Sequence, residues 1–375
     1  MKVYFDNAAT TAIAPEVLAE MLPYFNENYG NPSSIHALGR KSRAAIEKAR
    51  KVVANYLGAS TAEIFFTSGG TEANNMILKK AVEDLGVKRL ITTAIEHHCV
   101  LHTAHSIAKQ GVEVIYLEVN NFGEINYEQL ENLLQNQEKK TLVSLMHSNN
   151  EIGILLDLHR VGQLTRANNA LFHTDSVQTV GYFPINVLEN NIDFLSGSAH
   201  KFHGPKGIGF AYINGNNSLK PFIDGGSQER NMRAGTENLY GIVGLGKALE
   251  ICIQDMEQTK QKIASLKQAM ISQLKNEIAD VEFNGLLDEQ LSHFKVLNVS
   301  LPKTIKTDLI VFNLDIAGIA ASGGSACSSG SEVGSHVLAG IQANPDRNSV
   351  RFSFSKYNTI EEVQHVVAEL KKLVN

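Results

Sequence analysis

Short runs of β-branched and aromatic residues recur between positions 64 and 213, and segments with a helical spacing of apolar residues separate most of them. Runs of this kind, bounded by turn residues, are typical of buried strands. They are IFFT (64–67), RLITTA (89–94), VEVIYLEV (112–119), TLVSLMH (141–147), ALFHTD (170–175), DFLSGS (193–198) and GIGFAYI (207–213). Because strands that alternate with helices form βαβ units, the pattern predicts an α/β fold with a mostly parallel sheet sandwiched by helices.

The pattern changes in the second half of the chain. Apolar residues recur there at spacings of three and four, which predicts one long helix over 237–278. They include Leu245, Leu249, Ile253 and Met256. Beyond this helix, VLNVSLP (296–302) and VRFSFS (350–355) are predicted strands, and residues 359–374 form a predicted amphipathic helix. Together these elements predict a smaller α+β domain.

Length and composition fit this division into two domains. The chain has 375 residues, of which 43% are hydrophobic and 19% charged, the balance of a folded globular protein. We expect a large domain over residues 15–255. The smaller domain combines residues 1–14 with residues 256–375.

Charge and cysteine content exclude several classes of protein. The chain has 34 Lys and Arg against 39 Asp and Glu, for a formal net charge of −5. Neither sign is gathered into long blocks, so the basic patch of a nucleic-acid binder is not indicated. No stretch approaches about 18 uncharged apolar residues, and the start, MKVYFDNAATTA, lacks a signal-peptide core, so we expect no membrane segment and a cytoplasmic location. The three cysteines are far apart, which indicates neither a disulfide framework nor a zinc ribbon. Small-molecule chemistry is the remaining expectation.

Two titratable residues follow predicted strands. Lys201, in SAHKFHGPKGIG, comes just after an apolar strand, where desolvation would yield the neutral amine that Schiff-base formation requires. Asp175, in FHTDSVQ, ends another strand, where an acid can keep a pyridinium nitrogen protonated. Each residue also has a simpler explanation: Lys201 as a surface lysine and Asp175 as a helix N-cap.

Two further motifs suit anions. IFFTSGGTEANN (64–75) is a strand, a glycine turn and a helix start, which together suit a phosphate, although a lone glycine pair more commonly forms a capped turn without a ligand. In VRFSFSKYN (350–358), Arg351 shares the polar face of a short strand with Ser353 and Ser355. Its guanidinium would suit a substrate carboxylate if that face lines a cleft, and would otherwise be solvated.

A metal site and a dinucleotide site are weaker possibilities. EHHCVLHTAH (96–105) places His98 and His102 one turn apart beside Cys99, but no distant cluster completes a coordination sphere, so we expect no metal. GIVGLG (241–246) resembles half of a dinucleotide fingerprint, but it follows no strand and lies within a helical pattern. Close helix packing explains it better.

Ten motifs in order resemble the pyridoxal-phosphate cysteine desulfurases of the nitrogen-fixation and iron–sulfur-assembly type, within the class V aminotransferases. The resemblance covers nearly the whole chain, and HKFHGPKG together with GSAC is its most specific part. The motifs are YFDNAATT, GNPSSIHALGR, TSGGTEANN, EHH, NNEIG, HTDSVQ, SAHKFHGPKGIG, RAGTEN, SGGSACSSG and RFSFSKYNT. The chain departs from the family pattern where ILLD follows NNEIG and where Cys99 follows EHH.

The resemblance implies fold type I of the pyridoxal-phosphate-dependent transferases, with roles for particular residues. Lys201 would bind pyridoxal 5'-phosphate covalently, Asp175 would pair with its ring nitrogen, Gln178 would reach the ring hydroxyl, and His97 would lie over the ring as a proton carrier. The resemblance also implies a homodimer that acts on L-cysteine, with Arg351 on the substrate carboxylate. The other implied cofactor contacts are Asn150, the phosphate cradle of Gly70, Thr71, Ser198 and His200, and Thr236 from the neighbouring subunit.

Cys327 matches the cysteine that forms a persulfide in this family. It lies in ASGGSACSSG (321–330), whose small residues bury little apolar area and leave the backbone free, as a thiol that visits both a deep cleft and an external acceptor requires. The implied reaction converts L-cysteine to L-alanine, and an iron–sulfur scaffold or a tRNA-thiolation protein would accept the sulfur. His97 is the candidate base for an incoming thiol.

Three other functions are compatible with parts of this pattern. A selenocysteine lyase or a plain C–S lyase would use the same cofactor, and activity on each substrate separates them. A catalytically idle docking subunit would be colourless when purified. A metal-binding protein built on the histidines is the third possibility.

Overall fold

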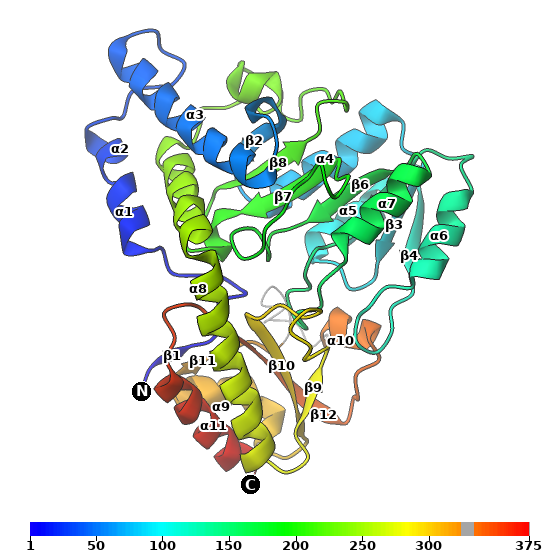
Figure 1. Ribbon diagram of the computed structural model, residues 1–375, viewed down its shortest axis with the longest axis vertical. Helices are drawn as coiled ribbons and strands as arrows, with labels where there is room; N and C mark the ends of the chain where they lie inside the picture. Colours follow the sequence, from blue (N-terminus) through cyan, green and yellow to red (C-terminus); the bar gives the residue numbers. More distant parts are fainter. Residues whose placement is uncertain (324–333, 375) are drawn as a thin grey trace.

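The computed structural model describes residues 1–323 and 334–374, and its centre is a seven-stranded sheet in the order β2-β8-β7-β6-β5-β3-β4 (Figure 1). The strands are β2 (Ile64–Thr67), β3 (Arg89–Thr93), β4 (Glu113–Leu117), β5 (Thr141–Ser144), β6 (Leu171–Asp175), β7 (Phe194–Ser198) and β8 (Gly209–Ile213). β4, β3, β5, β6 and β7 pair in parallel, and β8 runs antiparallel to both of its neighbours. Each predicted run contains one of these strands, and the mostly parallel sheet is confirmed.

Helices cover both faces of this sheet because its strands are apolar on both sides. Neighbouring residues of one strand, such as Phe194 and Leu195 of β7, enter two different core clusters. One cluster includes residues of α4 (Gly70–Leu85) and α5 (His98–Ala108). The other includes residues of α3 (Ala37–Leu57), α6 (Tyr127–Gln135), α7 (Leu158–Ala167) and α8 (Leu239–Glu277). The predicted sandwich is therefore present.

A smaller antiparallel sheet, β12-β10-β9, lies at the other end of the molecule (Figure 1). Its strands are β9 (Glu282–Asn284), β10 (Val296–Pro302) and β12 (Arg347–Ser353), and α9 (Ile310–Ile316) and α11 (Ile360–Val374) accompany it. β12 begins before its predicted first residue, Val350. The remaining elements are β1 (Val3–Tyr4), β11 (Ile319–Ala320), α1 (Pro15–Met21), α2 (Pro23–Asn26), α10 (His336–Gly340) and the short 3-10 helices η1 (Thr61–Glu63), η2 (Ala199–Lys201), η3 (Gln228–Asn231) and η4 (Thr307–Leu309).

Two segments join the sheets. α8 runs unbroken from the large sheet to the small one (Figure 1), so the predicted boundary between residues 255 and 256 falls inside a helix. The segment after β1 contacts both parts, because Asn7 donates from Nδ2 to the Ser353 carbonyl at 2.9 Å and Thr11 donates from its main-chain N–H to the His200 carbonyl at 2.9 Å. The first residues of the chain thus run between β12 and η2.

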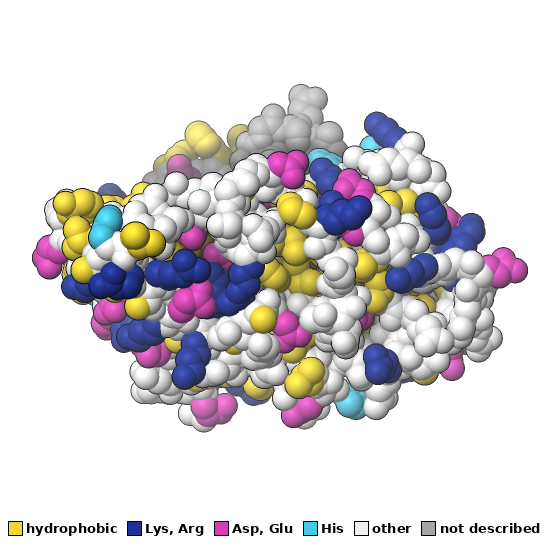
Figure 2. Space-filling model, turned by 90° about the horizontal axis from the view of Figure 1, so that it is seen from above, with side chains coloured by type: hydrophobic (Ala, Val, Ile, Leu, Met, Phe, Trp, Pro, Cys, Tyr) yellow, Lys and Arg dark blue, Asp and Glu magenta, His cyan; other side chains and the backbone are white. Residues whose placement is uncertain are grey.

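One face of the molecule agrees with the charge expectation. On the face that Figure 2 shows, Lys and Arg side chains are interspersed with Asp and Glu. Within residues 1–323 and 334–374, no helix is long and apolar enough to span a bilayer.

Candidate active site at the carboxyl edge of the large sheet

Most of the predicted site residues lie at one edge of the large sheet. Asp175 and Ser198 are the last residues of β6 and β7, Lys201 ends η2, and Gly70 begins α4 just after β2. The carboxyl ends of parallel strands form the edge where α/β proteins bind ligands. The order of elements alone therefore brings these residues together.

The first residues of the chain hold Lys201 and Gln178 side by side. The Lys201 ammonium donates to the carbonyl oxygens of Ala8 at 2.7 Å and Ala9 at 2.8 Å. Gln178 donates from Nε2 to the same Ala8 carbonyl at 3.0 Å, and its Oε1 is buried without a hydrogen bond from the described residues. Lys201 is half-buried, which excludes a freely exposed surface lysine.

Asp175 is a buried carboxylate with two different partners. Its Oδ1 accepts the Val177 N–H at 3.0 Å within a turn; no helix begins there, so the alternative of a helix N-cap is wrong. Its Oδ2 accepts a hydrogen bond of 2.7 Å from Nδ2 of Asn74, a residue of α4. Asn74 was not predicted, although it lies in TSGGTEANN one helical turn after Gly70.

His97 caps α5 next to this carboxylate. Its Nδ1 accepts the main-chain N–H of Cys99 at 3.2 Å. Burial lowers the pKa of His97; the charge of Asp175 opposes that effect and the charge of Lys201 adds to it. The ring is therefore neutral at neutral pH and lies within electrostatic reach of both residues.

Glycines keep a small cradle open at the start of α4. No side chain of the described residues caps this helix, so its first N–H groups are available to an anion. A Cβ added to Gly69 would project to 3.7 Å from the Ser198 Oγ, and one added to Gly70 would clash with Val177 at 2.5 Å. Serine hydroxyls and helix N-termini suit a phosphate, so the site fits the one predicted here.

His200 borders this region as a neutral ring. Its Nδ1 lies 3.1 Å from the Thr10 Oγ1. Burial, together with the charge of Lys201, lowers the pKa of His200 to about 3. His200 can therefore offer a hydrogen bond to a phosphate but no charge.

Arg351 is 1% exposed, so the alternative of a solvated arginine is wrong. Its Nη2 lies 2.7 Å from the Asp6 Oδ1, and its Nη1 donates to the Asn150 carbonyl at 2.9 Å. Its Nε is buried and has no hydrogen-bond partner among the described residues. The arginine thus retains donor capacity for a carboxylate, and Asp6 is a partner that sequence reasoning missed.

Two predicted residues are not in this group. Thr236 is exposed and lines a separate hollow with Phe25, Tyr29 and Tyr240. Cys327 lies outside the described residues. Just before that gap, Ser322 pairs with Arg351, whose N–H donates to the Ser322 carbonyl at 2.6 Å.

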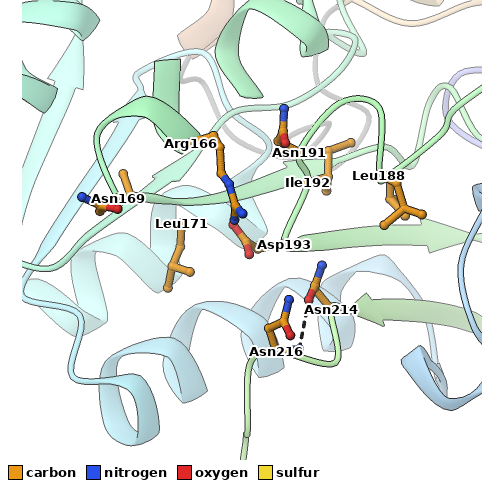
Figure 3. A pocket seen from close by; sticks show the side chains of 11 residues that line it. Arg166, Asn169, Leu171, Leu188, Asn191, Ile192, Asp193, Asn214 and Asn216 are labelled. Carbon is orange, nitrogen blue, oxygen red and sulfur yellow. Dashed lines mark hydrogen bonds between the residues drawn. The ribbon is translucent and has the colours of Figure 1, made fainter. Parts of the chain in front are cut away.

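A different hollow lies at the opposite edge of the large sheet (Figure 3). Its volume is about 390 Å³, and Arg166, Asp193, Asn214 and Asn216 are among its lining residues. Asp193 is already paired, because it accepts the Phe172 N–H at 2.9 Å and the Asn217 amide at 3.1 Å. Within residues 1–323 and 334–374, no group of three or more His, Cys, Asp and Glu side chains could hold a metal ion.

Comparison with known proteins agrees with the motifs. The model of the aminotransferase class-V family matches residues 3–366. The chain is 41% identical to "Cysteine desulfurase IscS" of Dictyoglomus turgidum, covering 100% of this chain and 94% of the relative, and 41% identical to "Putative cysteine desulfurase IscS 1" of Bacillus subtilis, covering 99% of each. Among solved structures, a NifS-like protein matches with a TM-score of 0.91 at 37% identity, covering 100% of this chain and 99% of the other. The structure described as "SspA in complex with cysteine" matches with a TM-score of 0.83 at 34% identity, covering 96% and 100%.

Proposed function

This chain belongs to the aminotransferase class-V family and is a pyridoxal-phosphate-dependent cysteine desulfurase, and from that premise we propose which residues perform the reaction. Lys201, Asp175 and His97 serve the cofactor, Arg351 binds the substrate, and Cys327 receives the sulfur. The observation that carries this assignment is the convergence of a lysine amine, a buried carboxylate and an open anion cradle at one sheet edge.

Each cofactor contact follows from the chemistry of the side chain. The Lys201 amine would hold the aldehyde carbon covalently, the Asp175 carboxylate would hold a proton on the ring nitrogen, and Gln178 would donate to the ring hydroxyl. When bound, the cofactor stores the electron pair that is released from the substrate Cα. The phosphate contacts are Gly70, Thr71, Ser198 and His200, and Asn150 is a further contact.

The protein groups then act on L-cysteine in a defined order. Arg351 binds the substrate carboxylate, and the Lys201 amine takes the proton from Cα. The Cys327 thiolate attacks the substrate sulfur, so that an S–S bond forms as the C–S bond breaks. The carbon that loses sulfur gains a proton, and Cα regains its own from the Lys201 ammonium, which leaves L-alanine and a Cys327 persulfide.

The division into domains separates the proposed cofactor contacts from the residues that act on the substrate. We retain the proposed large domain, residues 15–255, and the proposed smaller domain, residues 1–14 with 256–375. All of the proposed cofactor contacts belong to the first, whereas Arg351 and Cys327 belong to the second. A substrate held by Arg351 would therefore lie between the two domains.

We propose that the enzyme is a homodimer. Support comes from the hollow around Thr236, where Phe25 and Tyr240 stack at 4.3 Å between ring centroids and Tyr29 is 65% exposed. Exposed aromatic groups of this kind are typical of surfaces that a partner covers. A second copy seated there would bring Thr236 to its phosphate cradle.

The sulfur would leave on a protein acceptor, an iron–sulfur scaffold or a tRNA-thiolation protein, in the cytoplasm and without direct contact to nucleic acid. Support comes from a cavity of about 1130 Å³ lined by residues on both sides of segment 324–333, including Gly323 and Gly334. Leu309 and Phe312 on its border are 61% and 60% exposed. Persulfide transfer from the loaded enzyme to each purified acceptor, followed by mass spectrometry, decides between the two.

The test of the whole assignment is Cys327→Ser. This variant should keep the visible absorbance of the bound cofactor and lose sulfide release in the presence of a reductant. After addition of L-cysteine, Cys327 of the parent enzyme should gain about 32 Da, the mass of one sulfur atom. Cys252→Ser is the matched control and should keep its turnover; retained turnover in Cys327→Ser would refute the nucleophile assignment.

A further inference from the structure

The thiol of Cys99 contacts two side chains of α4 and that of His97, the N-cap residue of α5. Its Sγ lies 3.0 Å from the His97 Nδ1 and 3.1 Å from the Asn74 Nδ2. The Thr71 side chain also hydrogen-bonds this thiol. No step of the proposed reaction uses Cys99.

This thiol connects the proposed cofactor contacts to one another. Asn74 donates one amide hydrogen to Asp175 at 2.7 Å and the other to Cys99. Its orientation is fixed, because a carboxylate can only accept and Asn74 must therefore turn its amino group toward Asp175. The Cys99 sulfur therefore contacts Thr71 and His97 directly and is connected to Asp175 through Asn74.

The direction of the hydrogen bonds follows from the protonation of the thiol. Burial raises the pKa of Cys99 to about 12; the charge of Asp175 adds to this and the hydrogen bond from Asn74 opposes it. The sulfur therefore keeps its hydrogen at neutral pH. Because Sγ accepts from Asn74, its own hydrogen is available to the His97 Nδ1, which also accepts the Cys99 main-chain N–H at 3.2 Å.

We propose that Cys99, held by Asn74, is a positioning residue that fixes His97 in the tautomer with Nδ1 unprotonated and the hydrogen on Nε2. Neutral His97 then donates a hydrogen bond through Nε2 and cannot accept a proton there. This inference rests on the proposed function and makes the neutral His97 ring a hydrogen-bond donor through Nε2, without transfer of that proton. The proton of an incoming thiol must pass to another group.

The charged and titratable groups that act on His97 come from four elements. They are Asp175 of β6, Lys201 of η2, His336 of α10, and His98 and His102 of α5. None of them is altered by a substitution at Cys99. A change in the titration of His97 in a Cys99 variant would therefore report the lost thiol contact.

The experiment is ¹⁵N NMR of the resting holoenzyme labelled at histidine, with His97 assigned through the signal that disappears in His97→Gln. In the parent enzyme at neutral pH, Nδ1 should give the signal of an unprotonated nitrogen and Nε2 that of a protonated one. Because a donor to Nδ1 favours the neutral ring, Cys99→Ala should raise the pKa of His97 by about half a pH unit. Cys99→Ser, whose hydroxyl can also donate, should restore the parent value.

Cys252→Ala is the matched control, because its thiol faces the Phe202 carbonyl at 3.6 Å and should leave His97 unchanged. A protonated Nδ1 in the parent enzyme would overturn the proposal whatever the variants do. So would an unchanged pKa of His97 in Cys99→Ala, or an equal shift in Cys252→Ala. The NMR measurement needs no turnover. A protein that shows the Nε2–H signal but no desulfurase activity would therefore contradict the proposed function and not the proposed tautomer of His97.

Discussion

The two edges of the large sheet both carry polar side chains, yet they differ in how these groups are satisfied. At the carboxyl edge, Asn74 Oδ1, Ser176 Oγ and Gln178 Oε1 are buried without a hydrogen-bond partner among the described residues. At the opposite edge (Figure 3), Asp193 has two partners and Asn214 accepts the Asn216 N–H at 3.0 Å. Because unpaired buried polar groups cost stability, a fold retains them where a ligand completes them. The unsatisfied groups next to Lys201 and Asp175 therefore support a ligand at this edge.

Removal of the lysine amine is the strongest way to test this contrast. Lys201→Ala should lower kcat by at least about 10³-fold, because it removes both the covalent anchor and the base, and it should change the visible spectrum of the bound cofactor. Sulfide release and absorbance of the same sample measure the two effects. Lys206→Ala is the matched control: Lys206 is exposed in the same HKFHGPKG motif and should be dispensable.

The next largest effect is expected from Asp175, the carboxylate at the carboxyl edge. Asp175→Asn should lower kcat about a hundredfold, because an amide cannot supply the charge that holds a proton on the ring nitrogen. Since the charge of Asp175 raises the pKa of His97, the same variant should also lower that pKa. Steady-state kinetics and histidine NMR test these outcomes separately. Wild-type kcat in Asp175→Asn would remove the carboxylate from the proposed site.

The sequence predicts the strands of the large sheet well because each combines a β-branched or aromatic run with turn residues at its ends, whereas it does not predict the short strands β1, β9 and β11. Asp175, Ser198 and Lys201 could be found for a related reason, since each follows such a run and strand ends meet at one edge. The start of β12 was missed because its first residues are polar. Arg347, Asn348 and Ser349 become strand by pairing with Pro302, Leu301 and Ser300 of β10, which no local pattern reveals.

Partners supplied by distant segments were also missed. Asp6 lies 345 positions from Arg351, and the Ala8 carbonyl reaches Lys201 across 193 positions. Both residues stand in the motif YFDNAATT, but nothing in that motif indicates what they contact. Sequence reasoning treats Cys99 as a departure from the family pattern and as a neighbour of His98 and His102. It does not reveal the contact with His97, because that arrangement depends on Asn74, a residue of another helix.

Substitution of Arg351, the proposed clamp on the substrate carboxylate, should have a smaller effect that is confined to substrate binding. Arg351→Lys should raise KM for L-cysteine about tenfold with little change in kcat, because an ammonium cannot reproduce the planar fork that also holds Asn150 and Asp6. Arg347→Lys is the matched control, since Arg347 lies on the same strand and pairs with Asp280 at 2.9 Å instead. An equal rise of KM in both variants would show that the effect comes from strand stability and not from the clamp.

The smallest effect is expected from Asp193→Asn at the opposite edge, where kcat/KM should stay within about twofold and the free energy of unfolding should change by less than about 1 kcal/mol. Burial raises the pKa of Asp193, and the hydrogen bond from the Phe172 N–H opposes that effect. A carboxyl whose pKa is higher in the folded than in the unfolded protein binds more protons in the folded state. The protein therefore loses stability as pH rises from the ordinary pKa of this carboxyl through the raised one. Asparagine does not ionise, so the variant should gain stability relative to the parent over this range, as urea unfolding at pH 4 and pH 7 can measure. If Asp193→Asn instead lowered kcat as much as Asp175→Asn does, the difference between the two edges would have no functional meaning.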